Sequence, residues 1–132
     1  MDDFRILREE ARRVLGRMTF GEERNAGTVA AALKTRTGNI FTGICAHLCC
    51  GIGTCAEHAA VLEMLKSRET VVEKIIAISE TEILSPCGRC RELLVQIDAR
   101  NVETLVMIGE EEVVRLGDLL PSSWLGRKKG YQ

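Results

Sequence analysis

Apolar side chains recur at helical spacing near the start of the chain. Between residues 2 and 18 they advance mostly by three or four positions, while arginine and glutamate fill the opposite face; the apolar residues are Phe4, Leu7, Ala11, Val14, Leu15 and Met18. This pattern predicts an amphipathic helix that covers a core on one side and meets water on the other. Residues 20–27 contain two glycines among charged residues, which is typical of a loop.

Short apolar runs later in the chain predict strands. There are five of them, at residues 28–33, 40–45, 75–78, 105–108 and 112–116. The first two are joined by Thr35–Asn39, which favours an antiparallel hairpin, and the last is expected at an edge. Helical patterns cover Cys55 to about Arg68 and Cys87 to about Ile97, and a short helix is expected at 117–124.

Apolar strands that alternate with helices are typical of strands covered on both faces. The sequence therefore predicts an α/β fold: a three-layer α/β/α sandwich with a mixed sheet of about five strands. A single domain over residues 1–132 is expected, because 132 residues is a common domain size. Its motifs lie within about 28–121, and residues 126–132, which include the basic run 127–129, are expected to be a mobile tail.

The composition of the chain argues against several classes of protein. The 18 basic and 19 acidic residues give a net charge of −1, which argues against a protein that binds nucleic acid polymers. No apolar run approaches the roughly 20 residues that cross a bilayer, and the mixed-charge N-terminus does not resemble a secretory signal, so a cytoplasmic location is expected. In that compartment, six cysteines indicate metal binding or catalysis rather than disulfides.

Two cysteine motifs open the two predicted buried helices. Cys55-Ala56-Glu57 begins one helix, and Pro86-Cys87-Gly88-Arg89-Cys90 begins the other. Cys87 and Cys90 share a helical face, and a thiolate at a helix N-terminus has a lowered pKa. Two such helix starts can present three thiolates to one Zn²⁺ and leave a fourth position open, as in catalytic zinc sites.

Glu57 adds a carboxylate that need not bind the metal. A carboxylate beside metal-activated water can take up a proton and pass it on. Cys-x-Glu followed by Pro-Cys-x-x-Cys matches the signature of zinc deaminases that act on nucleobases.

With these motifs the sequence resembles the cytidine deaminase family, most closely its blasticidin S deaminase-like members. The resemblance implies that Cys55, Cys87 and Cys90 bind one zinc ion. It also implies that Glu57 carries protons from the attacking water to the ring nitrogen and then to the leaving amine. The matching segments are Ile40–Gly43, Cys55–Glu57, Ser85–Arg91 and Leu119–Pro121.

The same resemblance implies substrate contacts and partners. The backbone N–H of Ala56 would hold the ring carbonyl of a small amino-heterocycle, and the backbone carbonyl of Ser85 would accept from its amino group. A homo-oligomer is expected, a tetramer by resemblance, in which loops of neighbouring subunits close each site.

Two positions depart from the family pattern. Cys45 and His47 stand where cytidine deaminases carry the Asn and Glu that hold ribose, and Gly27 replaces an aromatic residue before the first strand. A thiol binds hydroxyl groups less well than an amide does. Cys45 and His47 are therefore candidate substrate contacts, and the departures weigh against a plain ribonucleoside.

The predicted activity is hydrolytic deamination of a cytosine-type heterocycle, such as cytidine, deoxycytidine, a blasticidin S-like compound or a related base, with release of ammonia. One alternative is a deaminase of a different ring, such as a purine, a pterin or a modified base. A second is a non-catalytic protein whose structural zinc site takes a fourth ligand from Cys49 or Cys50, although buried inert thiols are the preferred interpretation of that pair.

Four further side chains have open roles. Arg89, or less favourably Arg91, is expected to bond a cysteine sulfur and offset the negative charge of three thiolates on zinc. His58 is expected to be structural. Trp124 can stack over a heterocycle or pack at a subunit interface.

Overall fold

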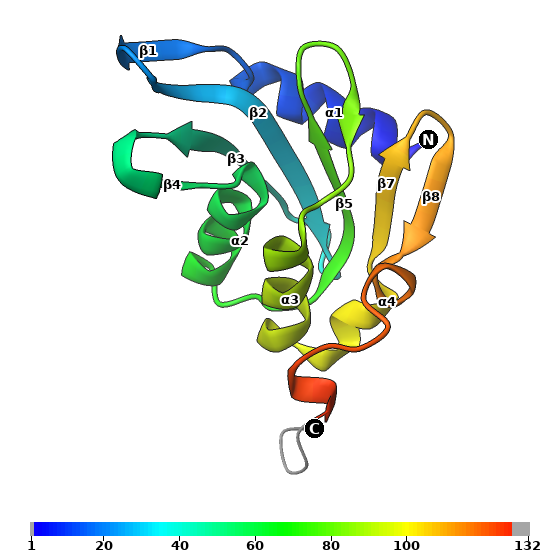
Figure 1. Cartoon of the computed structure of the whole chain (residues 1–132). Coiled ribbons are helices and arrows are strands. Elements are labelled where there is room, and N and C mark those ends of the chain that lie inside the picture. Colours follow the sequence, from blue (N-terminus) through cyan, green and yellow to red (C-terminus); the bar gives the residue numbers. More distant parts are fainter. Residues whose placement is uncertain (1, 128–132) are drawn as a thin grey trace.

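The computed structural model describes residues 2–127, in which helices lie on both sides of one sheet (Figure 1). The strands are β1 (Met18–Gly21), β2 (Arg24–Thr35), β3 (Ile40–His47), β4 (Gly53–Thr54), β5 (Val72–Ile78), β6 (Ile83–Leu84), β7 (Leu105–Gly109) and β8 (Glu112–Arg115). The helices are α1 (Asp3–Val14), α2 (Ala56–Lys66), α3 (Gly88–Ile97) and α4 (Leu116–Leu119), with 3₁₀ turns η1 (Cys49–Gly51), η2 (Ala99–Glu103) and η3 (Leu125–Arg127).

The sheet is mixed, with the order β4-β3-β2-β5-β7-β8. The long strand β2 is antiparallel to both of its neighbours, β3 and β5, whereas β5 and β7 are parallel. β3, β5 and β7 therefore run in the same direction, and β8 closes one edge as an antiparallel strand. β1 and β6 pair with β2 and β5 outside this path.

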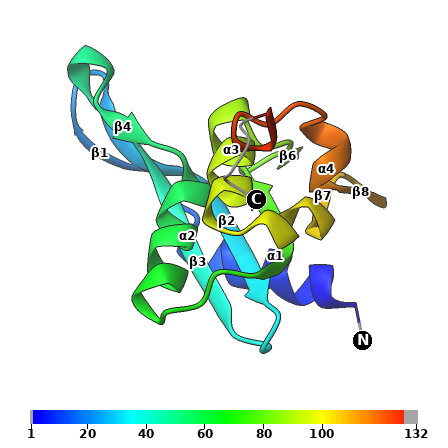
Figure 2. The ribbon, with the colours of Figure 1, turned by 90° about the horizontal axis from the view of Figure 1, so that it is seen from below.

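Alternate residues of β2 build the two cores. Ala30 and Ala32 face α1, whose Phe4, Leu7 and Ala11 are buried against them. Ala31 and Leu33, on the other face, are buried with residues of α2 and α3: Ala60, Val61, Met64, Leu94 and Val95. This alternation has the period of two that a strand requires. Figure 2 shows α1 on one side of the sheet and α2 and α3 on the other, which confirms the predicted α/β/α sandwich.

Gly43 of β3 sets how closely α2 approaches the sheet. A Cβ atom at this position would lie 2.4 Å from the backbone nitrogen of Ala60 and 2.7 Å from the backbone oxygen of Ala56. Real Cβ atoms do not approach backbone that closely, so only glycine fits there. The contact holds the first turns of α2, where Glu57 lies, against β3.

The structure has more strands than the predicted five. β1, β4 and β6 are two to four residues long and were not predicted, because such short pieces carry no measurable periodicity. Residues 20–27, expected to form a loop, contain the turn between β1 and β2 and the start of β2.

The expected helix at 117–124 is also wrong in extent, since only Leu116–Leu119 is helical and Pro121 follows in a turn. Proline lacks the N–H that continues a helix, and it disfavours helical backbone in the residue before it. Residues 128–132 of the expected mobile tail lie outside the described residues. Among residues 2–127, no helix is both long and apolar enough to cross a membrane.

Candidate metal and catalytic site

Three cysteine sulfurs meet between the starts of α2 and α3. Cys55 and Cys87 are the extended residues immediately before the two helices, and Cys90 lies in the first turn of α3. The Sγ atom of Cys87 is 3.7 Å from that of Cys55 and 3.6 Å from that of Cys90. The sequence placed these residues on two helix starts, and the fold brings the starts together.

The spacing of the three sulfurs fits zinc. A tetrahedral ion with Zn–S bonds of about 2.3 Å holds its sulfurs roughly 3.8 Å apart. The three Sγ atoms all lie within 4.8 Å of one another, and within residues 2–127 this group contains no fourth ligand. Three protein ligands leave one coordination position open, which is typical of a catalytic rather than a structural zinc site.

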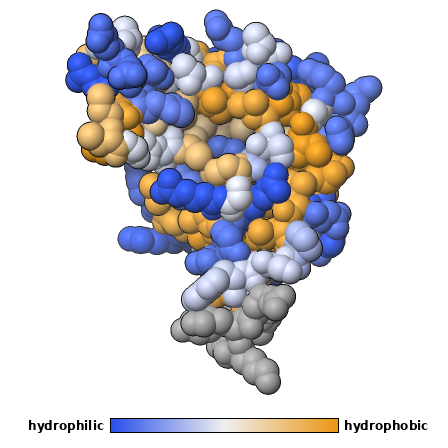
Figure 3. Space-filling view, in the orientation of Figure 1, coloured by the Kyte–Doolittle hydropathy of each residue, from blue (hydrophilic) through white to orange (hydrophobic). Residues whose placement is uncertain are grey.

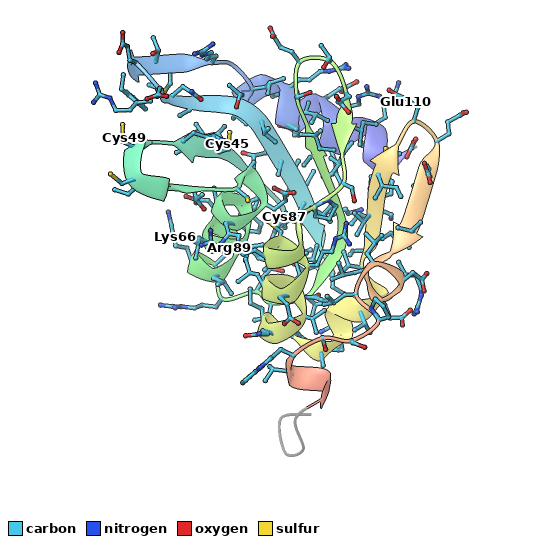
Figure 4. The ribbon with its side chains drawn as sticks, in the orientation of Figure 1. Cys45, Cys49, Lys66, Cys87, Arg89 and Glu110 are labelled. Carbon is cyan, nitrogen blue, oxygen red and sulfur yellow. The ribbon has the colours of Figure 1, made fainter. Side chains whose placement is uncertain are left out.

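The remaining cysteines lie away from this group. Cys49 and Cys50 are exposed in η1, the turn between β3 and β4, rather than buried as the preferred interpretation had it. Figure 4 shows Cys49 at the outer end of that hairpin, far from Cys87 at the top of α3. Neither residue belongs to the group of potential metal ligands, which weighs against the four-cysteine alternative.

The three thiols differ in the direction in which their surroundings shift the pKa. Burial is the main reason that the pKa values of Cys55 and Cys90 are raised, and the nearby carboxylate of Glu57 acts in the same direction. Burial also opposes ionisation of Cys87, but backbone N–H groups of Cys90 and Arg89, together with the neighbouring thiols, lower its pKa overall. Cys87 is therefore the thiol that ionises most readily at the helix start.

Glu57 is a buried carboxylate in the first turn of α2, with 6% of its surface exposed. Burial raises its pKa, and hydrogen bonding to its own backbone and to Cys90 offsets part of that rise. A carboxylate whose pKa is raised toward neutrality suits proton transfer in both directions.

A pocket of about 420 Å³ opens in front of these groups. This volume is typical of sites for small molecules. The predicted site residues that line it are Cys45, His47, Cys55, Ala56, Glu57, Ser85, Cys87 and Arg89, while Cys90 lies behind them. Side chains of Val29, Leu48, Ile52 and Leu84 give the walls an apolar character. Figure 3 shows apolar residues in the centre and on the right of this side of the molecule, bordered by hydrophilic residues.

Cys45 and His47 occupy different parts of the pocket. The Cys45 thiol is buried on β3, accepts a hydrogen bond from the backbone N–H of Val29 and lies 3.3 Å from the Thr28 hydroxyl. His47 ends β3 and is exposed. Cys45 is therefore already bonded to its neighbouring strand, whereas His47 lies at the rim.

The two arginines of the second motif have separate environments. Arg89 lines the pocket between α2 and α3 (Figure 4), and within residues 2–127 no hydrogen bond joins its guanidinium to a cysteine sulfur, although its backbone N–H bonds that of Cys87. Arg91 donates instead to the backbone oxygens of Pro86 and Leu119 and to the Ser85 hydroxyl. This arrangement could not be inferred from the sequence, because it depends on how two loops meet.

His58 and Trp124 lie outside the predicted ligand set. The pKa of His58 is lowered, first by burial and then by the charge of Arg89, and its Nε2 atom is buried with no hydrogen-bond partner among residues 2–127. Trp124 is exposed, its backbone N–H donates to Glu92, and it does not line the pocket of its own chain.

A family model described as "Cytidine and deoxycytidylate deaminase zinc-binding region" matches residues 7–106, which include both cysteine motifs. The chain belongs to this deaminase family. Its cofactor is accordingly zinc, and Cys55, Cys87 and Cys90 form a possible site for it.

Other members of the deaminase family are similar in sequence and in structure. Blasticidin-S deaminase of Bacillus cereus is 30% identical over 90 residues, which are 59% of this chain and 63% of that protein, so the match spans less than two thirds of the relative. Cytidine deaminase of Mycobacterium tuberculosis superposes with a TM-score of 0.79 at 27% identity, covering 94% of this chain and 98% of that one. The Mycobacterium leprae cytidine deaminase, at 21% identity and a TM-score of 0.76 over 92% of this chain and all of that chain, shares the fold.

Proposed function

We propose that the chain is a hydrolase that removes the amino group from a cytosine-type heterocycle and releases ammonia. The observation that carries this proposal is the position of Glu57, a buried carboxylate that lines the same pocket as two of three sulfurs spaced for one zinc ion. A structural zinc site has no need of a buried carboxylate beside it.

Cys55, Cys87 and Cys90 would hold the metal, with Cys90 buried and the other two at the pocket. When bound, zinc lowers the pKa of water and stabilises developing negative charge on oxygen. Glu57 takes a proton from water as its oxygen bonds to the amino-bearing carbon, and passes that proton to the adjacent ring nitrogen. Glu57 then takes the remaining proton of the former water, from the hydroxyl group now on that carbon, and transfers it to the amino group. The C–N bond breaks, ammonia leaves, and the hydroxyl oxygen becomes the ring carbonyl.

Backbone groups beside the catalytic residues orient the ring. The N–H of Ala56, at the start of α2, would donate to the ring carbonyl of the substrate, and the carbonyl of Ser85 would accept from its amino group. Both residues line the pocket, Ala56 at the start of α2 and Ser85 in the loop before α3, which supports this assignment.

Arg89 would offset the net negative charge that three thiolates leave on a zinc site. Two observations support this role. Arg89 lies at the pocket, close enough for its charge to affect His58, and it forms no ion pair within residues 2–127. A long, flexible side chain can reach a sulfur without a change of backbone.

The substituent on the ring is expected to differ from plain ribose. Cys45 is bonded to Thr28 and Val29, and the wall around it is apolar, so His47 is the candidate substrate contact that stays accessible. A purine, pterin or modified base is the second candidate, because a pocket of about 420 Å³ also accommodates a larger ring.

The substrate class is tested by measuring ammonia release by the zinc-loaded protein from a panel of compounds. The panel holds cytidine, deoxycytidine, cytosine, 5-methylcytosine, blasticidin S, guanine and a pterin. We expect turnover of a cytosine-containing compound other than cytidine as the best substrate. Cytidine as the best substrate would contradict the interpretation of Cys45 and His47, and exclusive turnover of guanine or the pterin would favour the second candidate.

The assembly and location of the protein remain predictions. A homo-oligomer, a tetramer by resemblance, is supported by exposed apolar residues around the pocket rim, among them Leu48 and Ile52. Light scattering at several protein concentrations tests it. The cytoplasmic location stays a prediction from the sequence.

A further inference from the structure

Arg91 joins two segments that are far apart in the sequence. Its Nε atom donates to the backbone oxygen of Pro86 at 2.8 Å, and Nη2 donates to the Ser85 hydroxyl at 3.1 Å. Nη1 donates to the backbone oxygen of Leu119, at the end of α4, at 3.0 Å. One guanidinium therefore ties the loop before Cys87 to the C-terminal part of the chain.

The loop that Arg91 holds carries a candidate zinc ligand. Pro86 directly precedes Cys87, whose sulfur must lie near those of Cys55 and Cys90 for the three to share a metal. Among the hydrogen bonds outside regular helices and strands of residues 2–127, those that reach Ser85 and Pro86 come from Arg91. The strand before them, β6, is two residues long and constrains the loop only at its start.

The residue after Arg91 holds the same C-terminal segment a second time. The carboxylate of Glu92 accepts a hydrogen bond from the backbone N–H of Trp124. Two adjacent residues of α3 thus fasten residues 119–124, one at each end. A displacement of the first turn of α3 would therefore move the loop before Cys87 and residues 119–124 together.

We propose that Arg91 is a positioning residue for the metal site and couples it to the segment of residues 119–124. It acts on Cys87 through the backbone of Pro86 and touches neither metal nor substrate. A planar guanidinium suits this task because its donors point in several fixed directions, whereas all donors of the lysine ammonium are on one nitrogen atom. The inference rests on zinc binding by the three cysteines, which is part of the proposed function, and is independent of the substrate.

The first test is the zinc affinity of the full chain, measured by competition with a chromogenic chelator. We expect Arg91→Met to weaken zinc binding about 10- to 100-fold, the usual effect of removing an outer partner of a metal ligand. Arg91→Lys is expected to weaken it as well, and it provides the measurement if Arg91→Met fails to fold. Arg100→Met is the matched control, because Arg100 is exposed and, among residues 2–127, its side chain bonds only Asp98.

The second test uses Trp124, the single tryptophan of the chain, as a reporter of residues 119–124. Acrylamide should quench its fluorescence more in the zinc-loaded Arg91 variants than in zinc-loaded wild type. Removing zinc from the wild type should raise the quenching, and removing it from Arg91→Met should change little. Leu7→Ala controls for loss of stability, because it creates a cavity in the core between α1 and the sheet, on the other face from the site. It should leave zinc affinity and quenching unchanged.

The outcomes separate this inference from the proposed function. Wild-type protein that binds no zinc would overturn both. Wild-type protein that binds zinc, together with Arg91 variants of equal zinc affinity, would overturn the inference alone. Quenching of Trp124 that does not respond to zinc in the wild type would overturn the coupling.

Discussion

The Sγ atoms of Cys55 and Cys87 lie 3.7 Å apart, although 32 positions of sequence separate them. Each residue immediately precedes a helix, so α2 and α3 begin at the same place. The positive ends of both helices favour thiolates at this point, an effect that lowers the pKa of Cys87 but that burial outweighs at Cys55. This meeting of two helix starts is the structural basis of the proposed metal site.

Replacing a cysteine of this group should remove the metal. We expect Cys87→Ser to lower zinc content from about one ion per chain to near zero, because two thiolates and a hydroxyl do not make a tight site. Cys49→Ser is the matched control, since Cys49 is exposed outside the group. Metal analysis after dialysis measures both. Equal loss of zinc from the Cys49 variant would place a fourth ligand in η1 and revive the structural interpretation.

Gly43 should tolerate no side chain. The Cβ atom of Gly43→Ala would meet the backbone of Ala60 at 2.4 Å, so α2 must shift away from β3. We expect a loss of about 1–3 kcal/mol in the free energy of unfolding, measured in urea. Gly16→Ala is the control, because nothing lies within 4 Å of a Cβ atom there, and its effect should stay within about 0.5 kcal/mol. Similar effects of the two substitutions would contradict the close packing of α2.

Asp98 should stabilise the fold except in acid. Bonds from the Arg100 side chain, its backbone N–H and the Thr70 hydroxyl hold the pKa of Asp98 well below its usual value. A lowered pKa in the folded state means that the stabilisation is complete above the unfolded value, about pH 4, and is lost as the pH falls below it.

The test is the unfolding free energy of Asp98→Asn relative to wild type. At pH 7 the variant should be less stable by about 1 kcal/mol, and the difference should shrink between pH 4 and pH 2. Asp118→Asn, at an exposed carboxylate, should show little change at either pH. A difference between Asp98→Asn and wild type that persists undiminished at pH 2 would show that the charge is not its source.

How much the sequence reveals about the fold depends on the length of each element. The helix at Asp3–Val14 and the pairing of β2 with β3 follow from long, regular patterns. β1 is four residues long, and its two apolar residues, Met18 and Phe20, are too few to indicate a strand. The end of the last helix, by contrast, carries a signal in the sequence: Pro121 disfavours helical backbone at Leu120, and α4 ends at Leu119.

The site likewise combines residues that the sequence predicts with contacts that only the fold shows. Cys55, Cys87 and Cys90 could be grouped because each lies on the first turn of a predicted helix, and Glu57 follows from its place in the motif. The bonds of Cys45 to Thr28 and Val29 depend on the register between β2 and β3, which local sequence does not determine. The three bonds of Arg91 depend on a contact between distant loops.

The most direct test of the proposed chemistry is to measure zinc content and ammonia release together in the wild type and in Glu57→Ala. We predict that the variant keeps about one zinc ion per chain and loses about 10²- to 10⁴-fold in turnover of the best panel compound, because only the proton carrier is gone. A Glu57 variant that deaminates at the wild-type rate would contradict the assigned role of Glu57. A wild type that binds zinc but releases no ammonia from any panel compound would contradict the proposed reaction.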